Sequence, residues 1–136
     1  MIVDATTAPV SGKGGMQTLH LSVAGGLRQF GAYLETLHPG AWSSHRHWHE
    51  KEDEFVLVLE GQVTLRDDNG LQDLGAGDAL CWRHGDPNAH HLTNRTDAPC
   101  RYLIVGARAA NDICHYPDSG RRLINDSTRW RIVEAD

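Results

Sequence analysis

The sequence contains no long hydrophobic run, and this absence excludes a membrane-spanning helix. Its longest uninterrupted apolar stretches are about five residues, whereas a helix that crosses a bilayer needs about 20. Residues 1–15 also lack the basic segment followed by an apolar segment that marks a secretory signal. We therefore expect a cytoplasmic protein with no membrane partner.

Cysteine is scarce, and its positions exclude two further classes. The three cysteines Cys81, Cys100 and Cys114 are widely spaced and form no CxxC pair. An odd number at this spacing does not build a disulfide framework, and without paired thiolates a structural tetrahedral zinc site is not expected. We predict three reduced thiols that are partly buried in the core. For Cys81, the alternative is a role as a metal ligand or nucleophile.

Positive charge is in deficit across the chain. Lys and Arg number 13 against 18 Asp and Glu, which leaves a formal net charge of −5. This balance offers no electrostatic attraction to nucleic acid or to an anionic membrane surface. Internal repeats and low-complexity segments are absent too, and 136 residues suit one domain with a proper hydrophobic core. We expect the partner to be a small molecule and not a nucleic acid.

Helical periodicity is almost missing, and short extended stretches take its place. Only residues 106–112 could form a short helix. Alternating or apolar stretches recur about every 8–12 residues with turn signals such as Asp67–Gly70 between them, the spacing of an all-β sandwich or barrel. The run Phe55–Leu59 is apolar on both faces, which predicts a central strand buried on each side. The other predicted strands cover residues 18–23, 28–37, 62–66, 71–74, 79–84, 90–94 and 101–105.

The densest chemistry lies at His47, His49 and Glu54. Two histidines two residues apart on an extended strand point to the same side, about 6–7 Å apart, so both imidazoles can lean onto one cation. A turn at residues 50–53 would let Glu54 begin the next strand from that same side. Neutral imidazole and carboxylate are both good ligands for a divalent metal. The pattern predicts a metal site across a hairpin.

The spacing of this segment resembles the first signature motif of the cupin superfamily. The matching run is Gly40-x6-His47-x-His49-x4-Glu54-x6-Gly61. Before the first histidine the family pattern has five residues, and this chain has six.

A second cupin motif has its counterpart downstream. A segment that begins at Gly77 contains Gly85 and ends in His90-x3-Asn94, which is similar to that motif. Arg83 stands where the family has proline, and four residues instead of two separate Gly85 from His90. With both motifs, the chain resembles the small single-domain bacterial cupins of the type-2 conserved-barrel kind.

The resemblance implies an all-β fold, the double-stranded β-helix or jelly-roll barrel of the cupins. It also implies one divalent transition metal per chain (Fe, Mn, Ni, Co or Zn), held by His47, His49, Glu54 and His90. Four protein ligands around an octahedral ion leave two cis positions for water or substrate. His91 is the competitor for His90, but neighbouring residues of a strand face opposite sides.

Four polar residues near the motifs are candidates for catalysis. Glu52, which is also the alternative carboxylate ligand, joins His45, Tyr33 and Arg83 as candidate acid–base or anion-binding groups. The resemblance favours a small metal-dependent enzyme of the isomerase, lyase or dioxygenase type, acting on a carboxylate or carbohydrate-like metabolite at the barrel mouth. The alternatives are a non-catalytic module that binds or senses a metabolite, and a protein whose metal is purely structural.

The two ends of the chain are expected to lie outside the barrel. We predict an N-terminal arm over residues 1–15, the barrel over 16–110 and a C-terminal tail over 111–136 that packs on the barrel or on a partner chain. The Trp130–Val133 segment could add an edge strand to either. Open sheet edges and an available arm predict a homodimer.

Overall fold

Antiparallel strands make up nearly all of the regular structure. The computed structural model describes residues 1–126 and 129–135. Within these residues the elements are β1 (Val10–Ser11), β2 (Met16–Leu19), α1 (Leu21–Ala24), β3 (Phe30–Leu37), β4 (Trp48–His49), β5 (Glu54–Glu60), β6 (Gln62–Asp67), β7 (Gly70–Gly75), β8 (Ala79–Trp82), β9 (His91–Thr93), β10 (Cys100–Ala107), β11 (Ile113–Tyr116), β12 (Arg121–Asn125) and β13 (Trp130–Val133).

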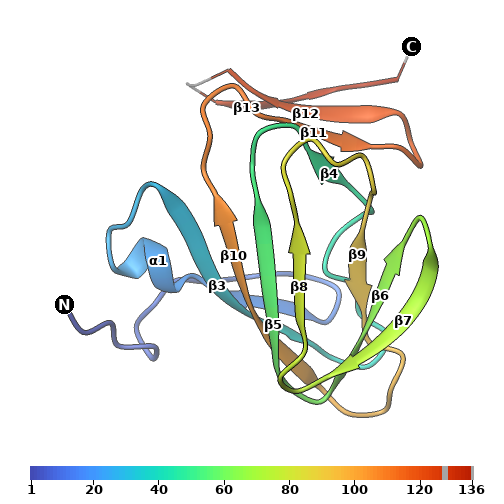
Figure 1. The fold of residues 1–136 in the computed structure, drawn as a ribbon. Coiled ribbons are helices and arrows are strands. Elements are labelled where there is room, and N and C mark those ends of the chain that lie inside the picture. The colour runs from blue at the N-terminus through green and yellow to red at the C-terminus, as the bar shows by residue number, and fades with distance from the viewer. Residues whose placement is uncertain (127–128, 136) are drawn as a thin grey trace.

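The strands form three sheets. A six-stranded sheet has the order β1-β2-β3-β10-β5-β8, and a three-stranded sheet has the order β7-β6-β9. The four-stranded sheet β13-β12-β11-β4 lies across the end of the barrel that these two form (Figure 1). This arrangement confirms the all-β jelly-roll prediction.

The core lies between the six-stranded and the three-stranded sheets. Val56 and Val58 of β5 meet Val63 of β6, and all three are almost fully buried because alternate residues of each strand face inward. Tyr102 of β10 is also fully buried in this cluster. β5 is central, as predicted, with β10 and β8 on its two sides. Its predicted burial on both faces is wrong, because Leu59 is 45% exposed.

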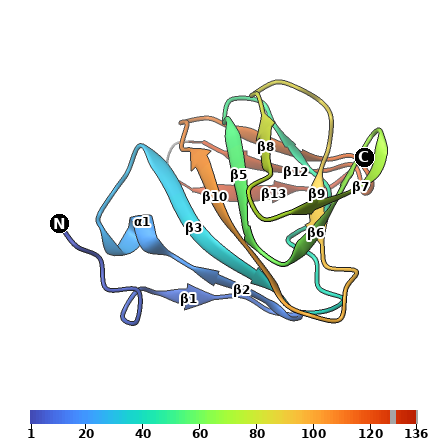
Figure 2. The same ribbon diagram turned by 60° about the horizontal axis from the view of Figure 1, so that its bottom comes forward.

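Two segments differ from their predicted secondary structure. The strand predicted over 18–23 ends at Leu19, and Leu21–Ala24 forms α1 beside β3 (Figure 2). The buried Ser22 hydroxyl accepts a hydrogen bond from the Ala32 N–H at 2.9 Å, which ties α1 to β3. The helix predicted at 106–112 does not form, because β10 continues to Ala107 and stays paired with β3.

The terminal segments join the sheets of this chain. β1, within the predicted arm, pairs with β2 at the sheet edge (Figure 2). β13 pairs with β12, so the edge strand expected at Trp130–Val133 forms within the same chain. The division of the chain at residues 15 and 110 stays a prediction.

All three cysteines are free thiols, as expected. Cys100 and Cys114 are buried, but Cys81 is exposed, so its predicted place in the core is wrong. The reason is alternation: Leu80 and Trp82 of β8 take the core side, which turns Cys81 outward. In the described part of the chain, no helix has the length and apolar character needed to cross a membrane.

Candidate metal centre

Three imidazoles converge on one carboxylate oxygen at the covered end of the barrel. The Nε2 atoms of His47 and His49 each lie 3.6 Å from Oε1 of Glu54, and Nε2 of His90 lies 3.1 Å from it. The structure therefore brings together the four residues that the sequence singles out as metal ligands. His90 is buried, and the other three side chains are 11–16% exposed.

These four residues come from separate parts of the fold. His47 and His90 form an isolated antiparallel bridge, in which each backbone N–H donates to the other's carbonyl. His49 lies in β4, which pairs with β11 of the four-stranded sheet. Glu54 begins β5 of the six-stranded sheet, opposite Trp82 and Gly106.

The predicted hairpin between the histidines and Glu54 is wrong, because β4 and β5 belong to different sheets. Two carboxylates accept backbone hydrogen bonds in and beside the connecting segment 50–53. Asp112 accepts a hydrogen bond from the Lys51 N–H at 2.9 Å, and Asp53 accepts one from the His84 N–H at 2.8 Å. The site is therefore formed where two sheets meet and not across a turn.

Each imidazole is oriented through its second nitrogen. Nδ1 of His49 lies 2.6 Å from Oδ2 of Asp112, whose side chain is fully buried. Nδ1 of His47 lies 2.9 Å from the His45 carbonyl, and Nδ1 of His90 lies 3.1 Å from the Asn88 carbonyl. The oxygen acceptor at each Nδ1 suits the neutral tautomer whose ring proton lies on Nδ1 and whose Nε2 is free to bind. This is the tautomer that binds a metal through Nε2.

The charges of the cluster depend on one another. Burial alone would raise the pKa of Glu54, but its interactions with His47 and His90 lower that pKa well below the usual carboxyl range. Burial alone would lower the pKa of His47, but Glu54 raises it above its ordinary value. Positive charge beside the buried carboxylate thus stabilises its ionised form, and a divalent cation among the Nε2 atoms would supply such a charge.

Two other groups of metal-ligating atoms lie next to this one. His47 and His49 lie near Cys114, but burial raises the pKa of that thiol to about 12, and a neutral thiol is a poor ligand. His49 also lies near Glu52 and Asp112. The Glu52 carboxylate is engaged, because its Oε2 accepts the Ala109 N–H at 2.8 Å. The donor set that best fits a divalent metal remains the three histidines with Glu54.

Asp112 is the member of the site that the sequence analysis missed. It lies 63 positions from His49 and was placed in a predicted helix. The available signal is its position directly before the strand Ile113–Tyr116, close to that of Glu54, which is the first residue of β5.

His91 has different surroundings from His90. Its Nδ1 donates to the Ser44 carbonyl at 2.8 Å, and its ring lies against Trp42. His90 instead stacks on Trp82, with ring centroids 3.8 Å apart. In the described structure, His91 makes no contact with Glu54.

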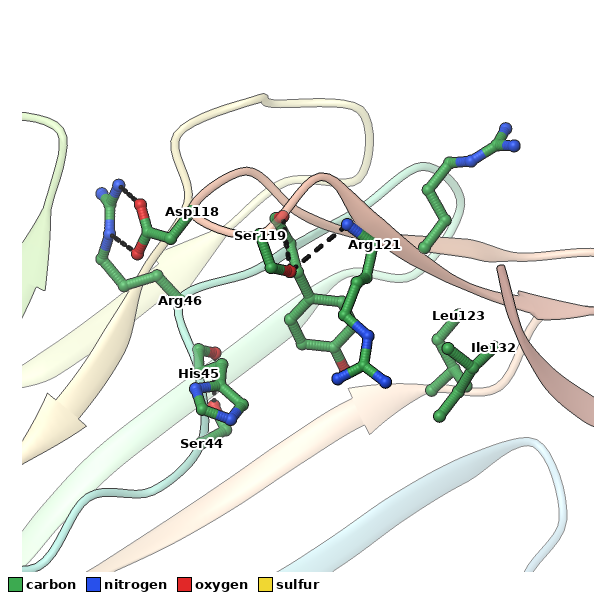
Figure 3. Close-up of a pocket in the computed structure, with 10 residues that line it drawn as sticks. Ser44, His45, Arg46, Asp118, Ser119, Arg121, Leu123 and Ile132 are labelled. Carbon is green, nitrogen blue, oxygen red and sulfur yellow. Dashed lines mark hydrogen bonds and ion pairs between the residues drawn. The ribbon is translucent and has the colours of Figure 1, made fainter. Parts of the chain in front are cut away.

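The four catalytic candidates fall into three places. Tyr33 and Glu52 line a cavity of about 320 Å³ that also includes His49 and Glu54. His45 lines a neighbouring cavity of about 420 Å³ (Figure 3). Arg83 is exposed beside Phe55 and Cys81, in a hollow on the outer side of the sheet. The first place includes two of the proposed ligands, His49 and Glu54, whereas Glu54 alone of the four lines the hollow beside Arg83.

The fold and the site together define a jelly-roll β-barrel protein with a candidate metal centre at one end. The model of the cupin domain matches residues 33–106, which is more than half of the chain. The chain therefore belongs to the cupin family.

Solved structures agree with this assignment. A sugar phosphate isomerase of the cupin superfamily from Silicibacter pomeroyi is 36% identical, with a TM-score of 0.91, over 98% of this chain and 92% of that one. A putative sugar phosphate isomerase from Acidithiobacillus ferrooxidans is 30% identical, with a TM-score of 0.82, over 88% of this chain and 76% of that one.

A more distant structure shares the fold alone. A predicted oxalate decarboxylase from Thermotoga maritima is 23% identical, with a TM-score of 0.67, over 80% of this chain and 100% of that one. No curated protein sequence matches this chain.

Proposed function

We propose that this protein is a metal-dependent isomerase that acts on a phosphorylated sugar. The observation that carries the proposal is the convergence of three Nε2 atoms on the buried Glu54 carboxylate, each ring being held through its Nδ1. The similarity to two structures described as sugar phosphate isomerases supports the substrate class.

His47, His49, Glu54 and His90 would hold the metal. When bound there, a divalent ion would supply Lewis-acid polarisation of a carbonyl and its neighbouring hydroxyl. Isomerisation also needs a group that moves a proton between adjacent carbons. Glu52 is the candidate, because its carboxylate lines the same cavity as His49 and Glu54.

The metal content of purified protein, measured by plasma mass spectrometry, tests the first half of the proposal. We expect one divalent metal per chain, lost or much weakened in His47→Ala, His49→Ala, His90→Ala and Glu54→Gln. His91→Ala is the matched control, since this neighbouring histidine contacts Ser44 and Trp42 instead. If the four variants keep their metal, the centre is elsewhere.

The second half is tested by incubating the metal-bearing protein with a panel of aldose and ketose phosphates and following interconversion by NMR. We expect at least one aldose–ketose pair to interconvert, and Glu52→Gln to abolish turnover while the metal stays bound. Binding of a sugar phosphate without turnover would favour the alternative of a metabolite-binding or sensing module.

A further inference from the structure

We infer that Arg108 binds the phosphate group of the substrate, at the far end of the cavity that begins at His49 and Glu54. This inference rests on the proposed function and adds the residue that recognises the anionic end of the substrate. Four observations carry it: the residues that line the cavity, the open space at Gly106, the charge of Arg108, and the carboxylate partners of Arg46 and Arg121 in the neighbouring cavity.

The cavity connects the candidate metal centre to an arginine. Its volume is about 320 Å³, near the lower end for small-molecule sites. Two proposed metal ligands, His49 and Glu54, form part of its wall, so a molecule inside it would lie beside the metal. The rest of the lining is Tyr33, Glu52, Ile104, Gly106, Ala107, Arg108, Asn125 and Trp130.

Two glycines provide the space beside Glu54. Gly106 of β10 is paired with Gly31 of β3 on one side and with Glu54 of β5 on the other. The Tyr33 ring lies over Gly31, in the position that a Cβ atom there would occupy. The space at Gly106 therefore stays open beside Glu54, and the space at Gly31 is taken by the Tyr33 ring, whose hydroxyl contacts Arg108.

Arg108 is held in place by neutral oxygen atoms. Its Nη1 donates to the Leu27 carbonyl at 3.2 Å, and its Nη2 donates to the Tyr33 hydroxyl at 3.0 Å. Among the residues that the structure describes, no carboxylate lies within ion-pair distance of this guanidinium. Its positive charge is thus uncompensated and preoriented, and a guanidinium is the group best suited to bidentate phosphate binding.

The neighbouring cavity of about 420 Å³ also contains arginines, but two of them have carboxylate partners. Arg46 is bound by Asp118, as Figure 3 shows, and Arg121 pairs with Glu134 at 2.8 Å. None of the four proposed metal ligands lines this cavity in the part of the chain that is described. A phosphate bound in the cavity at Arg108 would share that cavity with two of the proposed ligands, His49 and Glu54.

Calorimetric titration of the metal-bearing protein with two pairs of sugar acids tests this inference. The pairs are 6-phosphogluconate with gluconate, and 4-phosphoerythronate with erythronate. The members of each pair share a metal-binding 2-hydroxy acid and differ only in the phosphate. We expect wild type to bind the phosphorylated member of at least one pair roughly 10- to 100-fold more tightly, the range for charge-assisted hydrogen bonds.

Arg108→Gln should remove this preference without changing the affinity for the unphosphorylated acid. Arg108→Lys should restore part of it, because the charge returns without the planar fork. Arg121→Gln and Arg122→Gln, both in the neighbouring cavity, are the matched controls and should keep the preference. Thermal melts monitored by circular dichroism check that each variant folds, which the exposure of Arg108 leads us to expect.

The other outcomes overturn the inference in distinguishable ways. Loss of the preference in Arg121→Gln or Arg122→Gln, but not in Arg108→Gln, would place the phosphate in the larger cavity. Equal affinity of wild type for both members of each pair would remove phosphate recognition but leave the metal centre intact. Protein that holds no metal would refute the proposed function and the inference with it.

Discussion

At the scale of single residues, the candidate centre depends on side chains that contact the imidazoles from behind. Asp112 is the clearest case, because one of its oxygens contacts His49 Nδ1 and the other accepts the Lys51 N–H. Such partners fix the orientation and tautomer of a histidine ligand and make it more basic. A buried carboxylate in this position would orient His49 for a metal bound at Nε2 without contacting the metal itself.

Asp112→Asn should therefore weaken metal binding by roughly 10- to 100-fold while the four ligands stay in place. The Asn side chain carries no negative charge, and its single amide oxygen cannot replace both carboxylate oxygens, which contact His49 Nδ1 and the Lys51 N–H. Metal affinity, measured by competition with a chromophoric chelator, gives the result. Asp53→Asn is the control, since that carboxylate binds His84 at the surface. Unchanged affinity in Asp112→Asn would show that Asp112 has no influence on the ligand.

Glu35 is a second buried carboxylate, and it provides a test by pH. Burial raises its pKa above the ordinary 4.5, although hydrogen bonds from Tyr102 and Thr18 partly oppose the shift. The folded state thus holds this proton more tightly than the unfolded state does. Its contribution to stability is full below the unfolded pKa and decreases as the pH rises through the folded pKa.

Because the Gln side chain cannot ionise, the stability of Glu35→Gln should not decrease in this way as the pH rises. The free energy of unfolding of Glu35→Gln, relative to wild type, should therefore rise between pH 4.5 and pH 7, as measured by urea denaturation at several pH values. Glu60→Gln, at an exposed position, should show no such trend. A relative stability that falls as the pH rises would contradict the raised pKa.

At the scale of elements, Asn94 joins the end of β9 to its neighbours. Its amide nitrogen donates to the carbonyls of Leu37 and Ala98, both at 2.8 Å. Its amide oxygen accepts from the backbone and hydroxyl of Thr96. Asn94 is almost fully buried, so these bonds are shielded from water. The last residue of the second motif therefore shapes the turn between β9 and β10.

Asn94→Ala should lower the free energy of unfolding by about 3 kcal/mol, because the buried Leu37 carbonyl loses its side-chain donor and the Thr96 N–H loses its acceptor. Urea denaturation at neutral pH measures the change. Asn69→Ala, at the exposed tip of the β6–β7 hairpin, should change stability by about 0.5 kcal/mol or less. A cost for Asn94→Ala no larger than that of the control would show that water replaces these bonds.

At the scale of the whole molecule, the edge strands formed by the two terminal segments carry exposed apolar side chains. β13 is the outer strand of the four-stranded sheet, and its Trp130 and Ile132 are 43% and 60% exposed. β1 is the outer strand of the six-stranded sheet, and its Val10 is 56% exposed. Open edges with apolar side chains favour pairing with a second chain.

We accordingly expect a homodimer, with a mass twice the 15.0 kDa of the chain. Light scattering coupled to size-exclusion chromatography at micromolar concentration measures this mass. Ile132→Lys should shift the protein toward monomer, because it puts a charge on the β13 edge. Val23→Lys, in α1 and not on a sheet edge, should not. A wild-type mass near 15.0 kDa would refute the dimer.

Local patterns in the sequence predicted the all-β class and the positions of most strands, and the resemblance to the two cupin motifs added the set of residues that meet at Glu54. The class and the strand positions depend on local properties. Alternation of apolar residues sets which face of a strand is buried, and turn residues such as Asn69-Gly70 mark where strands end. Because neighbours on a strand face opposite sides, only one of His90 and His91 can point at the site, and the resemblance to the second cupin motif, through the spacing to Asn94, favours His90.

Which strands are neighbours became clear from the folded chain alone. The sequence analysis joined β4 and β5 in a hairpin, whereas β4 pairs with β11, more than 60 positions away, and thereby brings Asp112 to His49. The local sequence pattern likewise does not show that Gly31, Gly106 and Glu54 lie opposite one another on three neighbouring strands. Nor does it show that Arg108 and Glu54 line the same cavity. The physical reason is that strand periodicity specifies a buried face, while the choice of partner strand depends on packing between distant segments.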